Sequence, residues 1–403
     1  MDRKPLMGWH ALDSSRAEGS FPDKNGAFFV RKRTLGASGG ARGGAMGGGH
    51  GASASPRTLS RRALFASAGF AAASAALALA GCTGQDVVDA VTGARDTASY
   101  SGSTFAFDTY CTFTVYGDSA APAKLAKACA RYDELFDLYD AKSDIGRLNA
   151  AGGAPVQVDA ETVDVVKRAL AFCEASDGLF DITIGAVSTL WDFTKGVKPS
   201  DDAIAAALPH VSWQNVQVDE DARTITLKDP AAKLDLGGIA KGYVADRLCD
   251  LLKEETKAVA AVISLGGNIA YYGEKPGGGA WDTGIRDPND PGGSTVVGTA
   301  HVTGGSVVTS GLYERTFKQD GVTYWHILDP RTGKPVATDV VSDTVVCPSS
   351  TEADALSTTL FVAGSERGAQ IVDGYEDTAA FFIKDDDTTS ESSRWQELTS
   401  FEK

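Results

Sequence analysis

Cysteine, histidine and methionine are scarce in this chain, and the scarcity of cysteine already excludes some structures. The 403 residues include six cysteines, five histidines and three methionines. No two cysteines have C-x-x-C spacing, so a zinc site built on such pairs is excluded. The cysteines after Cys82 number five, which argues against a disulfide framework. One bridge could form among them, and we expect none.

Positive charge is also sparse, except near the start. The chain has 38 Lys and Arg against 53 Asp and Glu, and its first 82 residues hold 11 of the basic and 4 of the acidic ones. The remainder therefore carries 27 basic and 49 acidic side chains. A surface this acidic repels nucleic acid and anionic lipid, so we expect no nucleic acid among the partners.

The longest apolar run also lies near the start. Residues 36–55 are mostly Gly, Ala and Ser and cannot bury enough apolar surface to fold. Residues 1–56 are therefore predicted to be a disordered, low-complexity preamble. An arginine pair then precedes an apolar run over 63–80 that ends in Leu-Ala-Gly-Cys. Small residues before a cysteine favour a cleaved signal peptide, placed at 57–81, over a permanent membrane helix.

The four residues that end at Cys82 resemble a bacterial lipobox. The resemblance implies cleavage before Cys82 and a lipid anchor on it, so the protein would be extracytoplasmic and attached to the cell membrane. The alternative is an uncleaved anchor, which leaves the folded part on the same side. The arginine pair fits a twin-arginine signal and an ordinary export signal alike. Because a start at Met46 would give a signal of normal length, we expect the first 45 residues to be untranslated.

The rest of the chain shows no internal repeat and no linker. This predicts one catalytic domain over 105–384, after a spacer over 82–104 and before a polar tail over 385–403. Amphipathic spacing and alternation predict helices over 124–139, 160–175, 240–255 and 351–362, and strands over 105–117, 378–385 and much of 211–347. Strands joined by short turns, with few helices between them, predict an α+β fold of mixed, largely antiparallel sheets with flanking helices.

The segment LDLGGIAKGYVAD, residues 234–246, joins a buried strand to a helix through two glycines. Gly237 and Gly238 allow the backbone to approach a ligand closely. The first amides of the following helix can face an anion. Asp235 and Lys241 flank this bend, which suits a ligand that has both hydrogen-bond donors and phosphate. A plain structural turn is the alternative for the bend taken alone.

Asp354 and Thr358 are four residues apart in a predicted helix, so their side chains share one face. A carboxylate and a hydroxyl in this arrangement are oxygen ligands of the kind that magnesium accepts. Water, a backbone carbonyl and substrate phosphates would complete its coordination. Taken alone, the pair also fits an ordinary helix surface.

Further polar and aromatic side chains lie in short segments that could meet the glycine bend and the Asp354–Thr358 pair. They are Ser143 and Asn149 in SDIGRLNA, Trp191 and Phe193 in LWDF, Asn268 after a second Gly-Gly, Ser310, Tyr313 and Arg315 in TSGLYERTF, and His326, Asp329 and Arg331 in YWHILDPRTGKPV.

In this order, the segments LDLGGIAKGY, HILDPRTG and DALST resemble those of the ApbE family, the FAD:protein FMN transferases. The resemblance covers about residues 105–384. It implies an α+β fold, an extracytoplasmic and often lipid-anchored protein, and dependence on magnesium. It also implies transfer of FMN from FAD to a Thr or Ser hydroxyl of an acceptor protein, with release of AMP.

The resemblance assigns roles to individual residues. It implies a metal site of Asp354, Thr358 and a carbonyl of the bend, assigned to Gly238. It implies flavin-nucleotide contacts from Asn149, Trp191, Asp192, Phe193, Asp235, Lys241, Tyr313, His326 and Ile327. Many members have Met-Gly-Thr where this chain has Phe107-Asp108-Thr109, so a methionine contact with the flavin is not carried over.

His326 and Lys241 are the expected catalytic residues. An imidazole titrates near neutral pH, so His326 is the expected general base toward the acceptor hydroxyl, with Asp329 in reserve. Lys241 would add positive charge at the pyrophosphate. Two other functions stay open: hydrolysis of FAD to FMN and AMP at the same site, and passive flavin binding by a tethered lipoprotein.

Overall fold

The structure is a computed structural model that describes residues 98–290 and 294–403, all within one compact unit. The predicted preamble, the signal peptide, Cys82 and most of the spacer lie outside the described residues. Among the helices that are described, none combines the length and the hydropathy required to cross a membrane.

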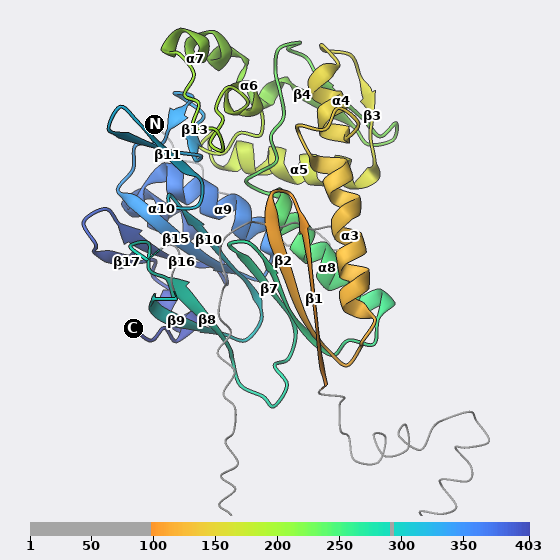
Figure 1. Cartoon of the computed structure of the whole chain (residues 1–403), viewed down its shortest axis with the longest axis vertical. Coiled ribbons are helices and arrows are strands. Elements are labelled where there is room, and N and C mark those ends of the chain that lie inside the picture. Colours follow the sequence, from red (N-terminus) through yellow and green to blue (C-terminus); the bar gives the residue numbers. More distant parts are fainter. Residues whose placement is uncertain (1–97, 291–293) are drawn as a thin grey trace, which may run out of the picture. The chain divides into compact units, whose positions relative to one another are not determined.

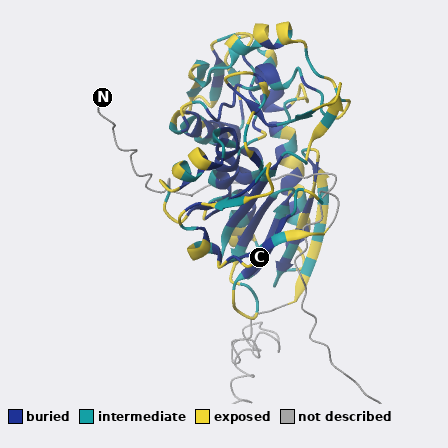
Figure 2. Ribbon diagram, turned by 90° about the vertical axis from the view of Figure 1, so that its left-hand side faces the viewer, coloured by how far each residue is buried: buried dark blue, intermediate teal, exposed yellow. Residues whose placement is uncertain are grey.

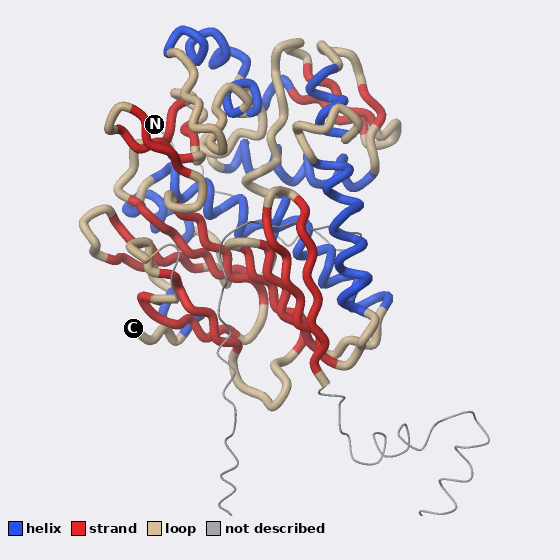
Figure 3. Tube along the Cα trace, viewed as in Figure 1, coloured by secondary structure: helices blue, strands red, loops and turns tan. Residues whose placement is uncertain are grey.

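A sheet of eight strands forms the centre of the fold, in the order β1-β2-β6-β7-β10-β15-β16-β17 (Figures 1 and 3). Every neighbouring pair in it is antiparallel. The strands are β1 (Ser99–Ala106), β2 (Thr109–Tyr116), β6 (Ala260–Leu265), β7 (Asn268–Gly273), β10 (Gly305–Gly311), β15 (Val340–Cys347), β16 (Ala379–Lys384) and β17 (Thr389–Glu391).

Smaller sheets and helices surround this sheet. The small sheets are β3 (Val156–Gln157) with β5 (Thr224–Leu227) and β4 (Val216–Asp219), β8 (Trp281–Arg286) with β9 (Val296–Val302), β11 (Thr316–Gln319) with β12 (Val322–Trp325), and β13 (Leu328–Asp329) with β14 (Lys334–Pro335). The α-helices are α3 (Ala121–Phe136), α4 (Asp144–Ala150), α5 (Ala160–Ala175), α6 (Gly185–Ser188), α7 (Asp201–Ala207), α8 (Ala240–Glu255), α9 (Ser350–Ala363), α10 (Ser365–Val372) and α11 (Trp395–Thr399).

Both faces of the large sheet are buried, because successive side chains of its central strands enter two different cores. In β16, Ala380 and Phe382 join the core formed with the helices, whereas Phe381 and Ile383 join a second core with β8, β9 and α11. Such strands read as continuous apolar runs rather than as alternating ones. Exposed residues along β1 mark one edge of the sheet (Figure 2).

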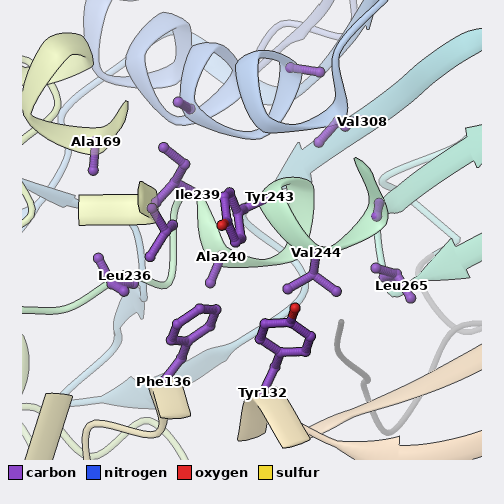
Figure 4. Close-up of a cluster of buried hydrophobic side chains, with 14 of the residues drawn as sticks. Tyr132, Phe136, Ala169, Leu236, Ile239, Ala240, Tyr243, Val244, Leu265 and Val308 are labelled. Atoms are coloured by element: carbon purple, nitrogen blue, oxygen red, sulfur yellow. The ribbon is translucent and has the colours of Figure 1, made fainter. Parts of the chain in front are cut away.

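Helix α8 lies at the centre of the larger core. Its residues Ala240, Tyr243 and Val244 are buried, as is Ile239 just before it (Figure 4). The same view places the aromatic rings of Tyr132 and Phe136, from α3, below the helix. The start of α8 is therefore fixed by packing on several sides, and this start is the end of the predicted glycine bend.

The predicted α+β class with largely antiparallel sheets is confirmed. Helices α5 and α8 have the predicted bounds, and α3 and α9 lie within three residues of theirs. The expectation of no disulfide is confirmed for the five cysteines that the structure describes, all of which are free.

The predicted extents of the spacer and of the first strand are wrong. Strand β1 occupies residues assigned to the spacer, and the predicted strand over 105–117 is interrupted by a tight turn. The turn residues Phe107 and Asp108 have positive φ angles of 51° and 61°. The alternation of apolar residues continues through the turn, and no glycine or proline marks it, so the sequence pattern shows no break.

The predicted polar tail is part of the fold. It contains β17 and α11, and the rings of Trp395 and Phe401 lie 5.4 Å and 4.9 Å from that of Phe381. These few aromatic residues anchor the segment although most of its side chains are polar, because each large ring buries much apolar area.

Candidate functional site

The glycine bend is held in place by two polar side chains from distant segments. Asp235 accepts hydrogen bonds from the Gly237 amide at 2.9 Å and from the Ser188 hydroxyl of α6 at 2.7 Å. Asn149 of α4 donates to the Leu234 carbonyl at 2.9 Å and accepts from the Leu234 amide at 2.7 Å. The structure thus gives Asn149 a positioning role, and its contact with a nucleotide stays a prediction.

Lys241, in the first turn of α8, faces the buried carboxylate of Asp354 in α9. Lys241 Nζ lies 3.1 Å from Asp354 Oδ1 and 3.2 Å from the Gly237 carbonyl oxygen. The Gly242 amide donates to Asp354 Oδ2 at 2.9 Å. Asp354 is only 2% exposed, so its charge is balanced by the ammonium and by the amide rather than by solvent.

The two helices can meet here because Gly242 has no side chain. A Cβ at Gly242 would lie 2.1 Å from the Ser350 carbonyl oxygen and 2.6 Å from Asp354 Cβ. No side chain fits at such distances without movement of the α9 backbone. Close approach of α8 and α9 is what brings the bend to the predicted metal ligands.

The oxygens at this junction suit a hard cation. The Gly238 backbone lies close to Thr358, since a Cβ built on Gly238 would be 3.0 Å from Thr358 Oγ1. That hydroxyl makes no hydrogen bond within the described residues. The carbonyl that faces the Lys241 ammonium belongs to Gly237, one residue before the predicted Gly238. The described chain has no cluster of three or more His, Cys, Asp or Glu side chains placed to bind a metal. A cation here would therefore need the hydroxyl and a carbonyl beside Asp354, as magnesium accepts.

The β11–β12 hairpin brings His326 toward the site. Phe317 and Tyr324 stack across the hairpin with ring centroids 5.3 Å apart. The Phe193 ring lies 5.7 Å from those of both Phe317 and Trp191. Edge-to-face contact between Phe193 and His326, at 6.5 Å, extends this aromatic cluster to the imidazole.

His326 is neutral in this environment. Burial, together with the positive charges of Arg315 and Lys241, lowers its pKa to about 3. Its Nδ1 atom is buried and has no hydrogen-bond partner among the described residues. The expectation that this imidazole titrates near neutral pH is therefore wrong for the ligand-free structure. A neutral imidazole nevertheless keeps a nitrogen that can accept a proton.

The other predicted contact residues differ in exposure and in hydrogen-bond partners. Trp191 is 4% exposed and donates to the Gly333 carbonyl at 3.3 Å, so it supports the aromatic cluster from within. Asp192 accepts from the backbone and side chain of Lys195 and so closes a local turn. Ile327 is buried. Burial, followed by the charge of Glu314, raises the pKa of Tyr313 to about 12.

The β11–β12 hairpin was not among the predicted elements, although its sequence carries a turn signal. Its turn is Asp320-Gly321, with φ angles of 53° and 79°. An Asp-Gly pair between apolar residues is a strong hairpin signal. The role of Ser188 had no such signal, because its partner Asp235 is 47 residues away in the chain.

Comparisons with known proteins point to one family. The model of the ApbE family matches residues 107–382. A FAD:protein FMN transferase of Treponema pallidum is 37% identical over 310 residues, which cover 70% of this chain and 84% of the relative. One from Klebsiella pneumoniae is 36% identical over 269 residues, covering 66% and 83%.

Solved structures show the same fold. The ApbE protein of Thermotoga maritima aligns with a TM-score of 0.68 and 33% identity, covering 75% of this chain and 99% of that one. The flavinyl transferase ApbE of Pseudomonas stutzeri aligns with a TM-score of 0.65 and 27% identity, covering 75% and 96%. The family model, the relatives and the fold together show that this chain belongs to the ApbE family.

Proposed function

We propose that this chain is a magnesium-dependent FAD:protein FMN transferase that acts outside the cytoplasm. It would join FMN to a Thr or Ser hydroxyl of an acceptor protein and release AMP. Transfer of flavin from FAD to a protein follows from the family and the relatives of this chain. The observation that supports magnesium-dependent transfer of FMN is the convergence of Lys241, Asp354 and Thr358 on the glycine bend.

These residues suit the pyrophosphate of FAD. The ammonium of Lys241 provides positive charge where a diphosphate would lie. The amides of Ala240 and Gly242, in the first turn of α8, already donate to the Leu236 carbonyl and to Asp354. Asp354, Thr358 and the bend carbonyl would hold the magnesium ion. When bound, that ion would neutralise phosphate charge and stabilise the departing AMP.

The transfer itself is a displacement at the FMN-side phosphorus. The acceptor oxygen forms a bond to this phosphorus, and the bond from the phosphorus to the AMP phosphate oxygen breaks. The proton of the acceptor hydroxyl must go to a base, and the unpartnered Nδ1 of His326 supports that role. Negative charge of bound phosphates opposes the effect of Arg315 and Lys241 on the imidazole, so substrate binding would raise its proton affinity.

The extracytoplasmic location remains a proposal from the sequence. It rests on the apolar run over 63–80 and on the Leu-Ala-Gly-Cys segment that ends at Cys82. Mass spectrometry of the protein from membranes of the producing cells would test it. We expect an N-terminal diacylated or triacylated Cys82, and an intact N-terminus in the soluble fraction would contradict the anchor.

The transferase proposal is tested with the full chain, FAD, magnesium and candidate acceptor proteins. We expect flavin fluorescence on the acceptor band of a denaturing gel, FMN on one Thr or Ser by mass spectrometry, and release of AMP. A chelator should abolish all three. Free FMN in equal amounts with and without acceptor would indicate an FAD hydrolase instead, and FAD left intact in the presence of magnesium would indicate a passive flavin-binding protein.

A further inference from the structure

Arg315 stands directly opposite His326 at the base of the β11–β12 hairpin. The His326 amide donates to the Arg315 carbonyl at 3.2 Å, which continues the register of Thr316 with Trp325 and of Phe317 with Tyr324. Opposed residues of an antiparallel pair have their side chains on the same face, close to each other. The guanidinium therefore extends from the same face as the imidazole.

Arg315 has no strong partner in the described part of the chain. Its guanidinium donates no hydrogen bond there, and its ion pair with Asp108 of the β1–β2 turn is 4.0 Å long. Both side chains are well exposed, at 51% and 75%. An exposed pair at this separation contributes little to stability, so Arg315 can be released from Asp108 at low cost.

Two positive charges reach the same imidazole. Burial, then Arg315, then Lys241 lower the pKa of His326. After residue 82, acidic residues outnumber basic ones by 49 to 27. Two cationic side chains close to one neutral imidazole are therefore unusual in this part of the chain. A phosphate placed beside His326 would lie between a lysine held by Asp354 and an arginine that is almost free.

We infer that Arg315 binds the FMN-side phosphate of FAD, and that Asp108 is its partner only while the site is empty. This assignment rests on the proposed function. The planar guanidinium can offer two parallel hydrogen bonds to a phosphate, which Lys241 cannot. Arg315 thereby becomes a substrate-binding residue for the phosphate that reacts, supplied by the hairpin rather than by the glycine bend.

The test measures ligand binding by the full chain, without an acceptor protein, for Arg315→Gln, Arg315→Lys and Asp108→Asn. Arg367→Gln is the matched control, because Arg367 is an exposed arginine of α10. Asparagine tolerates the positive φ of residue 108, so Asp108→Asn removes the charge without straining the turn. The ligands are FAD, FMN and AMP, each titrated by calorimetry with magnesium present.

For Arg315→Gln we expect FAD and FMN affinity to fall roughly 10- to 100-fold, while AMP affinity changes less than about twofold. Arg315→Lys should recover part of the loss. Asp108→Asn should increase FAD affinity by up to about fivefold, because the guanidinium no longer has to leave a carboxylate. In the Arg315→Gln background, Asp108→Asn should have no effect.

Unchanged FAD affinity in Arg315→Gln would overturn the assignment, as would an AMP loss equal to the FMN loss. Weaker FAD binding in Asp108→Asn would overturn the role given to that ion pair. A wild-type chain that binds no FAD would overturn the proposed function itself and this assignment with it. If Arg315→Gln also lowered the urea midpoint of unfolding, Arg315→Lys would separate the two causes. Restored stability with FMN affinity still below that of the wild type would support phosphate binding by the guanidinium, and FMN affinity restored fully together with stability would overturn it.

Discussion

Two regions supply the candidate site, and they are built differently. The α8–α9 junction is held by backbone contact at Gly242 and by a carboxylate that is 2% exposed, between helices that cover the large sheet. The β11–β12 hairpin forms its own two-stranded sheet and is attached through the tilted contact of Phe317 with Phe193, with an exposed tip. The first arrangement fixes oxygen and amide positions, whereas the second brings His326 and Arg315 to them. Substitutions in the junction should therefore affect both fold and binding, and those in the hairpin mainly turnover or the contact with one phosphate.

The largest effect should come from adding a single carbon to the junction. Gly242→Ala would force α8 and α9 apart, because its Cβ meets the Ser350 carbonyl at 2.1 Å. We expect a loss of about 1–3 kcal/mol or more in the free energy of unfolding, measured in urea, and loss of FAD turnover. Gly304→Ala is the control, since nothing lies within 4 Å of its added Cβ. Equal stability and activity of both variants would contradict the account of the junction.

His326→Ala should affect turnover and spare binding. Loss of a general base typically costs about a hundred- to ten-thousand-fold in rate. Because the junction is unchanged, the dissociation constant for FAD should stay close to that of the wild type. Single-turnover kinetics and calorimetry measure the two quantities separately. His210→Ala, which removes a histidine paired with Asp229, serves as the control. Normal turnover by His326→Ala would disprove the base assignment.

A smaller effect is expected from loosening the hairpin. Phe317→Ala removes the stack on Tyr324 and the contact with Phe193, each of which is worth about 0.5–1.5 kcal/mol beyond area burial. We expect turnover to fall on the order of tenfold, which corresponds to about 1.4 kcal/mol. Val322→Ala, at the half-exposed hairpin tip, should not change it. A loss of magnesium affinity as large as the loss of turnover would show that the hairpin and the junction are not separable.

The smallest effect should be that of pH on His326. With its pKa lowered to about 3, the ligand-free imidazole stays neutral from about pH 5 to 8. Its ring proton shifts in NMR spectra should therefore be flat over this range. A titration near pH 6.5 would contradict the described environment. Because the unfolded chain binds this proton more readily, the fold should lose stability as the pH falls from about 6.5 toward 3.

Much of the fold could be predicted because its signals are local. Helix α5 begins where Asp159 caps the Glu161 amide, and its apolar residues follow the helical period to Ala175. The second core of the sheet was not foreseen. The strand that contains Phe381 was predicted, but its contact with the rings of Trp395 and Phe401 is set only by the tertiary structure.

Some residues of the candidate site could likewise be predicted from local sequence patterns, and others could not. Lys241, Asp354 and Thr358 are placed by helix period and by adjacent glycines, both of which can be read in short segments. The pairs Asn149 with Leu234 and Ser188 with Asp235 join segments far apart in the chain, and no pattern in the sequence shows them. The neutral state of His326 likewise depends on burial and on two cations that only the fold brings near it.

The central claim is that the glycine bend and α9 together hold a cation on the diphosphate of FAD. Crystals of the chain grown with FAD and manganese, which replaces magnesium at oxygen sites, would test it by anomalous scattering. We predict one metal peak in contact with Asp354, Thr358 and a carbonyl of the bend, touching the FAD diphosphate, with Lys241 moved from its place between Gly237 and Asp354. A diphosphate bound elsewhere, with Lys241 still in that place and no metal beside it, would contradict the account.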